Sequence, residues 1–125
     1  MYRIRKHVDF SAAHQVLESG GACERLHGHN WKVVAHLEAA ELDALGMVID
    51  FKELKRALKA ILEPLEHSLL NEVPPFDGIN PTSENLARHV YDELTVRLAD
   101  DRVSIHRVDV WETEASCATY VGEDG

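Results

Sequence analysis

The chain has 125 residues, and its 22 Asp and Glu outnumber its 13 Lys and Arg, so the formal net charge is −9. This charge argues against nucleic acid or an anionic membrane as the main partner. No apolar run approaches the roughly 20 residues that a membrane span needs. The amino-terminal residues lack the apolar stretch of a secretory signal, so we expect a cytoplasmic protein. The length fits a single domain, which we expect to span residues 1–125.

Alternation of apolar and polar residues predicts the strands. The first half of the chain has two such segments, residues 3–12 and 30–38, separated by a glycine-containing loop. Residues 47–49 would extend or close this hairpin. Two further strands are predicted over residues 103–112 and 118–121. In the longer of these the apolar phase shifts after Ile105, which suggests a β-bulge.

Apolar residues at helical spacing predict two helices between these strand pairs. The first begins after Asp50, a good N-cap, and ends near Pro64, and Phe51 lies on its apolar face. The second is capped by Thr82 and has Glu84 in its first turn. The order ββααββ predicts an α+β domain, with a four-stranded antiparallel sheet and both helices on one face. Unpaired outer strands would then favour oligomerisation through the sheet.

Histidine is frequent in this chain, with eight copies, and three of them form a candidate metal site. His27 and His29 flank Gly28 at the start of a strand, where residues two apart point to the same face. His14 follows the neighbouring strand. Three neutral nitrogen ligands suit zinc and leave a fourth position open, as in catalytic sites. A His-X-His pair alone is more often a surface feature. We expect the remaining candidates to be solvated or hydrogen-bonded: His7, His36, His89 and His106.

Six sequence blocks, in order along the chain, carry a family resemblance. They are FSAAH (10–14), CERLHGHN (23–30), IDFKELK (49–55), HSLLN (67–71), NPTSENLA (80–87) and WETEASCATY (111–120). Together they resemble the 6-pyruvoyl-tetrahydropterin synthase superfamily, and most of all its bacterial 6-carboxy-5,6,7,8-tetrahydropterin synthase branch. The resemblance implies the tunnelling fold, in which sheets of three subunits close into a barrel. It also implies a homohexamer made of two stacked trimers.

The resemblance assigns roles to individual residues. It places the zinc ligands at His14, His27 and His29. A cysteine general base corresponds to Cys23 and a catalytic histidine to His67. The family usually has aspartate before this histidine, and here the position is Glu66, which retains the carboxylate.

The resemblance also indicates how a pterin would bind. Glu112 corresponds to the glutamate that accepts hydrogen bonds from the pterin amino and ring N–H groups. The pocket edge would include Thr82, Ser83 and Glu84, although helix capping alone explains Thr82. We expect Cys117 to be an inert buried thiol. Because it lies in the pterin block, a place in the lining of this pocket is the alternative. The triphosphate needs positive charge, for which the sequence offers Arg25, Lys6 or Lys32.

The implied substrate is 7,8-dihydroneopterin triphosphate, a small molecule whose side-chain hydroxyls zinc would polarise. Three functions remain open. A 6-carboxy-5,6,7,8-tetrahydropterin synthase would release acetaldehyde and triphosphate and serve 7-deazaguanine (queuosine-type) biosynthesis. A 6-pyruvoyl-tetrahydropterin synthase would keep the three-carbon side chain, and a third possibility is a non-catalytic zinc-binding relative. The short spacing from Cys23 to His27 favours the first, since the animal pyruvoyl enzymes have a longer gap there.

Overall fold

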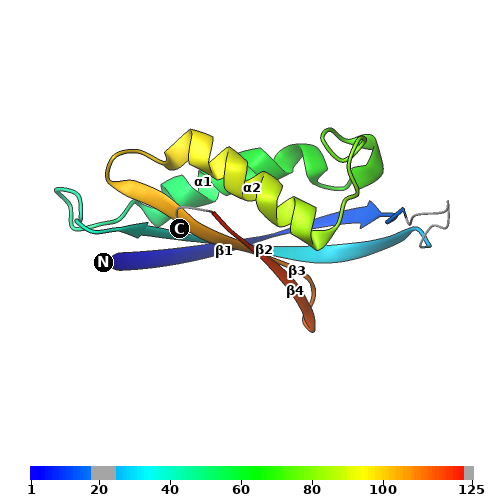
Figure 1. Cartoon of the computed structure of the whole chain (residues 1–125), viewed down its shortest axis with the longest axis horizontal. Helices are drawn as coiled ribbons and strands as arrows, with labels where there is room; N and C mark the ends of the chain where they lie inside the picture. The colour runs from blue at the N-terminus through cyan, green and yellow to red at the C-terminus, as the bar shows by residue number, and fades with distance from the viewer. Residues whose placement is uncertain (18–24, 123–125) are drawn as a thin grey trace.

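The computed structural model describes residues 1–17 and 25–122, so Cys23 lies outside the described residues. Four antiparallel strands form one sheet in the order β1-β2-β3-β4. The strands are β1 (Tyr2–His14), β2 (His27–Ala39), β3 (Val103–Thr113) and β4 (Ser116–Val121). Helices α1 (Phe51–Leu62) and α2 (Ser83–Leu98) both cover the same face of the sheet (Figure 1). The predicted α+β class and the ββααββ order are confirmed.

Each helix begins at the cap that the sequence predicts. The Asp50 side chain accepts a hydrogen bond from the Lys52 backbone N–H, and the Thr82 hydroxyl accepts one from the Asn85 N–H. Both bonds satisfy donors that the first helical turn leaves without a partner. Two short 3₁₀ helices lie between the α-helices, η1 (Glu63–Leu65) and η2 (Leu70–Glu72). Among the described residues, no helix combines the length and apolarity needed to cross a membrane.

The hydrophobic core fills the space between the sheet and the helices. Alternate residues of β2 point into it, including the fully buried Trp31, Ala35 and Leu37. They meet Leu54 and Leu58 of α1 and further leucines of α2. Burial at alternate strand positions against two amphipathic helices is the arrangement that the sequence pattern predicts. The opposite sheet face consists largely of charged and polar side chains, together with Val34 and Trp111.

Three details differ from or refine the sequence prediction. Strand β2 begins at His27 rather than at Asn30. Residues 47–49 form no strand, because they belong to an irregular loop whose carbonyls accept hydrogen bonds from the Arg102 guanidinium. Phe51 is 52% exposed and does not contribute to the buried face of α1. The predicted bulge is confirmed: His36 pairs with Arg107 and Leu37 with Ile105, which leaves His106 as the extra residue.

Candidate metal centre and active site

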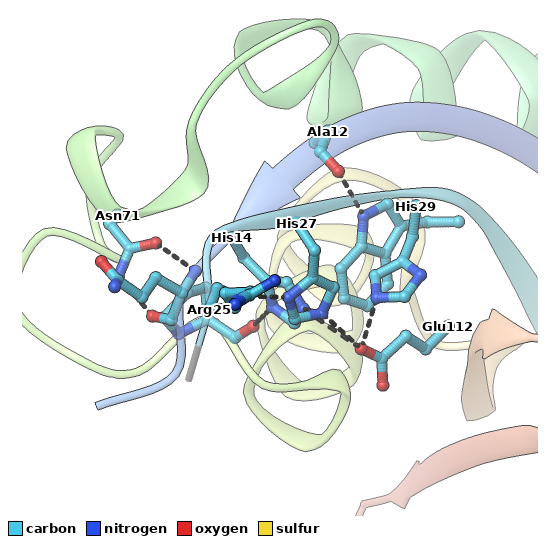
Figure 2. Close-up of polar contacts among 10 residues, drawn as sticks. Ala12, His14, Arg25, His27, His29, Asn71 and Glu112 are labelled. Atoms are coloured by element: carbon cyan, nitrogen blue, oxygen red, sulfur yellow. Dashed lines mark hydrogen bonds and ion pairs between the residues drawn. The ribbon is translucent and has the colours of Figure 1, made fainter. Parts of the chain in front are cut away.

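The pairing of β1 with β2 brings three histidines together at one end of the sheet. His14 lies directly opposite His27, and Ala12 lies opposite His29. Because side chains alternate along a strand, all three imidazoles point to the same face, the one that the helices cover. The ring centroids of His27 and His29 each lie within 5.3 Å of that of His14 (Figure 2). The sequence prediction that these three side chains can surround one site agrees with this geometry.

A fourth group, the Glu112 carboxylate, reaches the same point from β3. Its Oε1 atom lies 2.8 Å from Nε2 of His29, 3.1 Å from Nε2 of His14 and 3.7 Å from Nε2 of His27. One ligand atom from each of the four residues lies within 4.8 Å of the others. The sequence predicts that Glu112 binds the pterin, but it does not predict the position of Glu112 beside the histidines. Glu112 lies two residues after Val110 and four after Val108, both buried on the helix-covered face, and this even spacing is the signal that could have indicated it.

The hydrogen bonds of the rings determine which nitrogens are available. Nδ1 of His14 lies 2.7 Å from the Pro81 carbonyl oxygen, and Nδ1 of His27 lies 2.6 Å from that of Arg25. A carbonyl can only accept, so each Nδ1 must carry the proton and donate it. The two Nε2 atoms then face each other at 3.0 Å with lone pairs available. Nε2 of His29 is buried, and Oε1 of Glu112 lies 2.8 Å from it. This is the arrangement of a site prepared for a cation.

The donor set fits zinc. Neutral imidazole nitrogens are preferred zinc ligands, with Zn–N distances of about 2.0–2.1 Å, which place tetrahedral ligand atoms roughly 3.3 Å apart. The electrostatics favour the neutral ring. Burial lowers the pKa of His29, the Glu112 carboxylate opposes this, and the neighbouring His27 and His14 rings lower the pKa further. A carboxylate beside three imidazoles would also balance part of the charge of a divalent cation.

Trp31 packs against two of the three histidine rings. Its ring is fully buried and meets His14 edge-on at 4.9 Å and His29 at 5.4 Å between centroids. Its indole Nε1–H donates to the Ala12 carbonyl at 3.2 Å, which links β2 to β1 next to the cluster (Figure 2). His14 itself is only 1% exposed. The histidines are therefore mounted on paired strands, and two of their rings pack against a fully buried side chain.

The Glu66–His67 pair lies beside the cluster on the outer edge of β1. Oε1 of Glu66 accepts a hydrogen bond from the Ser11 backbone N–H at 3.2 Å and lies 3.2 Å from Nε2 of His67. The His67 side chain is 79% exposed, and its backbone adopts φ of +55°. A shallow hollow of about 450 Å³ has both His67 and His29 in its wall. The structure thus places the predicted catalytic histidine, His67, in the wall of the same hollow as His29.

A second hollow, of about 370 Å³, lies on the other side of the cluster. Its wall includes Ser83, Glu84, Glu112 and Cys117. These are the residues predicted at the pterin pocket, with the exception of Thr82. Thr82 does not line this hollow, and its hydroxyl accepts the capping bond from Asn85.

The three basic candidates for triphosphate binding lie in different places. The Arg25 main chain contacts His27 directly. Lys6 and Lys32 instead line a separate hollow of about 770 Å³ together with His36. Of the three, only Arg25 is therefore placed beside the histidine cluster.

Taken together, the fold and the cluster define an α+β protein with a candidate metal centre at one end of its sheet. A model of the family described as 6-pyruvoyl tetrahydropterin synthase matches residues 3–123. The chain belongs to the 6-pyruvoyl tetrahydropterin synthase family.

Relatives with two different names are similar to this chain. The human 6-pyruvoyl tetrahydrobiopterin synthase is 32% identical and covers 97% of this chain and 92% of its own. The Bacillus subtilis 6-carboxy-5,6,7,8-tetrahydropterin synthase is also 32% identical and covers 99% of this chain and 88% of its own. Among solved structures, the Caenorhabditis elegans 6-pyruvoyl tetrahydropterin synthase superposes with a TM-score of 0.83 at 27% identity, covering 98% of this chain and 96% of that one.

Proposed function

We propose that this protein is a zinc-dependent 6-carboxy-5,6,7,8-tetrahydropterin synthase. It would convert 7,8-dihydroneopterin triphosphate and water into 6-carboxytetrahydropterin, acetaldehyde and triphosphate. The observation that carries the proposal is the convergence of three imidazole Nε2 atoms and the Glu112 carboxylate, in a chain of this family. Relatives of both reaction types align at equal identity. The choice of product therefore rests on the short spacing from Cys23 to His27.

In this proposal zinc is held by Nε2 of His14, His27 and His29, whose Nδ1–H groups are occupied by backbone carbonyls or directed away from the cluster. When bound, the ion supplies a Lewis acid that stabilises negative charge developing on the substrate side chain. The protein contributes rigid placement. His14 and His27 each have a second hydrogen bond that fixes the ring, to Pro81 and Arg25 respectively. Such partners orient a ligand and set its tautomer.

Proton transfer is assigned to Cys23 and His67. A thiol has an ordinary pKa near 8.5, and a neighbouring cation favours the thiolate that can act as a base. His67 would carry the proton onward, with the Glu66 carboxylate fixing the ring. The 3.2 Å separation of Glu66 Oε1 and His67 Nε2 supports the view that glutamate can replace the usual aspartate.

Glu112 is proposed to anchor the pterin. A carboxylate can accept two hydrogen bonds from an amino group and an adjacent ring N–H, and an analogue without that donor pair would be rejected. Its position between the cluster and the hollow lined by Ser83 and Glu84 supports this role. Bound there, the pterin ring would place its side chain against the histidines.

We further propose that the site is completed by neighbouring subunits in a hexamer. Both hollows beside the cluster are small, at about 450 and 370 Å³, and His67 is largely exposed. A substrate with three phosphates needs more enclosure than that, since ligand sites usually bury most of their ligand. A second copy packed against this end of the sheet would supply it.

Product analysis tests the function. Zinc-loaded protein incubated with 7,8-dihydroneopterin triphosphate should give 6-carboxytetrahydropterin and acetaldehyde in equal amounts by mass spectrometry. Accumulation of an intact three-carbon pyruvoyl product without acetaldehyde would establish the 6-pyruvoyl-tetrahydropterin synthase instead. If a zinc-loaded hexamer shows no turnover, the protein is instead a non-catalytic zinc-binding relative.

A further inference from the structure

Asn71 binds the main chain immediately after His14 with both ends of its side-chain amide. Its Oδ1 accepts a hydrogen bond from the Gln15 backbone N–H at 2.8 Å, and its Nδ2 donates to the Gln15 carbonyl at 2.7 Å. Figure 2 shows this amide next to the chain that leaves the histidine cluster. The side chain thus makes the same pair of bonds that a residue of an adjacent strand would make.

Asn80 repeats this arrangement two residues further along. Its Oδ1 accepts from the Leu17 backbone N–H at 2.9 Å, and its Nδ2 donates to the Leu17 carbonyl at 2.8 Å. The two asparagines come from separate segments, one from η2 and the other from the loop before α2. Two side chains from separate segments thus make the same pair of hydrogen bonds to alternate residues. This repetition indicates that this edge is specifically held in place.

The asparagines continue a row of backbone pairing on the outer edge of β1. Nearer the sheet, the Ser11 carbonyl accepts from the His67 N–H at 2.6 Å, and the Ala13 N–H donates to the Ser68 carbonyl at 2.9 Å. Residues two apart in an extended chain present their N–H and C=O groups to the same side. Residues 11, 13, 15 and 17 are therefore all paired on one edge, first by backbone and then by side-chain amides.

The same segments also hold the His14 ring. The Asn80 carbonyl accepts from the Thr82 N–H at 2.9 Å and from Nδ2 of Asn85 at 2.8 Å, which fixes Asn80 to the start of α2. The next carbonyl, that of Pro81, accepts the Nδ1 proton of His14 at 2.7 Å. Backbone and ring of the β1 terminus are thus attached to one rigid unit.

We propose that Asn71 and Asn80 are positioning residues of the metal centre. Their amides replace the strand that is missing beside residues 15 and 17, prevent the end of β1 from fraying, and so keep Nε2 of His14 directed at His27. His67, whose backbone N–H donates to the Ser11 carbonyl, lies on the same edge. The inference rests on the proposed metal site.

The test compares zinc affinity in the unsubstituted protein, in four asparagine variants and in one control variant. Outer partners of metal ligands typically contribute about 10- to 100-fold to metal affinity. We expect losses of that size in Asn71→Ala and Asn80→Ala, measured by competition with a chromophoric chelator. Asn80→Asp and Asn71→Asp keep the acceptor and lose the donor, so they should lie between alanine and the unchanged protein. Co²⁺-loaded variants should show an altered visible spectrum, because the ligand geometry changes.

Arg102→Gln is the matched control. The Arg102 guanidinium also attaches a loop through backbone carbonyls, those of Glu41, Met47 and Val48, in the loop between β2 and α1. It should lower the unfolding midpoint while leaving zinc affinity and the Co²⁺ spectrum unchanged. Asparagine variants that lose only stability, as Arg102→Gln does, with unchanged affinity and spectrum would overturn the proposal. Absence of zinc binding in the unsubstituted protein would instead refute the metal site itself.

Discussion

Two groups of histidine and carboxylate lie on opposite faces of the same sheet, and they differ in how many partners each atom has. On the face away from the helices, Nε2 of His36 lies 2.7 Å from Oδ2 of Asp109, whose Oδ1 accepts from the Thr119 hydroxyl at 2.7 Å. The Arg107 guanidinium approaches the same carboxylate at 3.4 Å. One imidazole is matched to one carboxylate, and the carboxylate has further donors.

On the helix-covered face, three imidazoles share one carboxylate oxygen, that of Glu112. Two of them have their Nδ1 protons committed to backbone carbonyls. Nitrogen lone pairs are therefore in excess, and buried lone pairs that face each other are unfavourable without a cation. A histidine–carboxylate group is therefore a structural pair when hydrogen-bond donors and acceptors balance, and a candidate metal centre when acceptors are in excess.

The largest expected effect is on metal content. His27→Ala and His29→Ala each remove one of three nitrogen ligands, so both variants should lose bound zinc as purified. His36→Ala removes the histidine of the balanced pair and should retain one zinc per chain. Metal analysis by mass spectrometry checks all three. Full zinc in both ligand variants, or loss of zinc in His36→Ala, would contradict the assignment of one group as the metal centre and the other as a structural pair.

Cys23 and Cys117 offer a second contrast. Cys23→Ala removes a proton-transfer group and no ligand, so turnover should fall by about 10²- to 10⁴-fold while zinc content stays the same. Cys117→Ala should turn over substrate at nearly the normal rate, because that side chain only lines the hollow beside Glu112. Steady-state kinetics with 7,8-dihydroneopterin triphosphate measures both. Near-normal turnover in Cys23→Ala would mean that another group removes the proton.

Glu112→Gln separates two roles for the carboxylate. As the pterin anchor it would lose charged hydrogen bonds, and KM should rise roughly 10- to 100-fold. Zinc should stay bound, with only the small loss of affinity that follows from removing a nearby negative charge. As a permanent fourth ligand it would instead be needed for zinc. A large drop in zinc affinity with KM unchanged would reassign Glu112 from substrate to metal.

The smallest effect concerns the balanced pair. Burial alone would raise the pKa of Asp109, but the hydrogen bonds from Thr119 and His36 hold it below its ordinary value. The stabilisation is therefore present above the ordinary carboxyl pKa of about 4 and is lost as pH falls through the folded-state value. Thr119→Val should cost about 1 kcal/mol at neutral pH, with the difference shrinking below pH 4.

The matched control for this prediction is Thr95→Val in α2. The Thr95 hydroxyl donates to the Tyr91 backbone carbonyl on the exposed surface of the helix. Its stability difference from the unsubstituted protein, measured by urea denaturation, should be independent of pH. If the stability difference for Thr119→Val is the same at pH 3 as at neutral pH, the Thr119 hydrogen bond does not favour the ionised form of Asp109.

Much of this fold could be predicted from local sequence, and the site only in part. Alternation and capping identified the four strands and both helices, and the His-X-His spacing identified two rings on one face. The position of Glu112 depends on the β2–β3 register and its bulge, which no local pattern fixes. The contacts of Asn71 and Asn80 join residues 56 and 63 positions apart, and an asparagine in a loop normally indicates only a turn.

The central claim is that the histidine cluster is a three-nitrogen metal centre with an open position. X-ray absorption at the zinc edge of the purified, zinc-loaded protein tests it most directly. We predict a first shell of nitrogen and oxygen scatterers at about 2.0–2.1 Å, with three imidazoles and one exchangeable oxygen ligand. A sulfur scatterer at about 2.3 Å would make Cys23 a ligand and not the base, and would contradict this account.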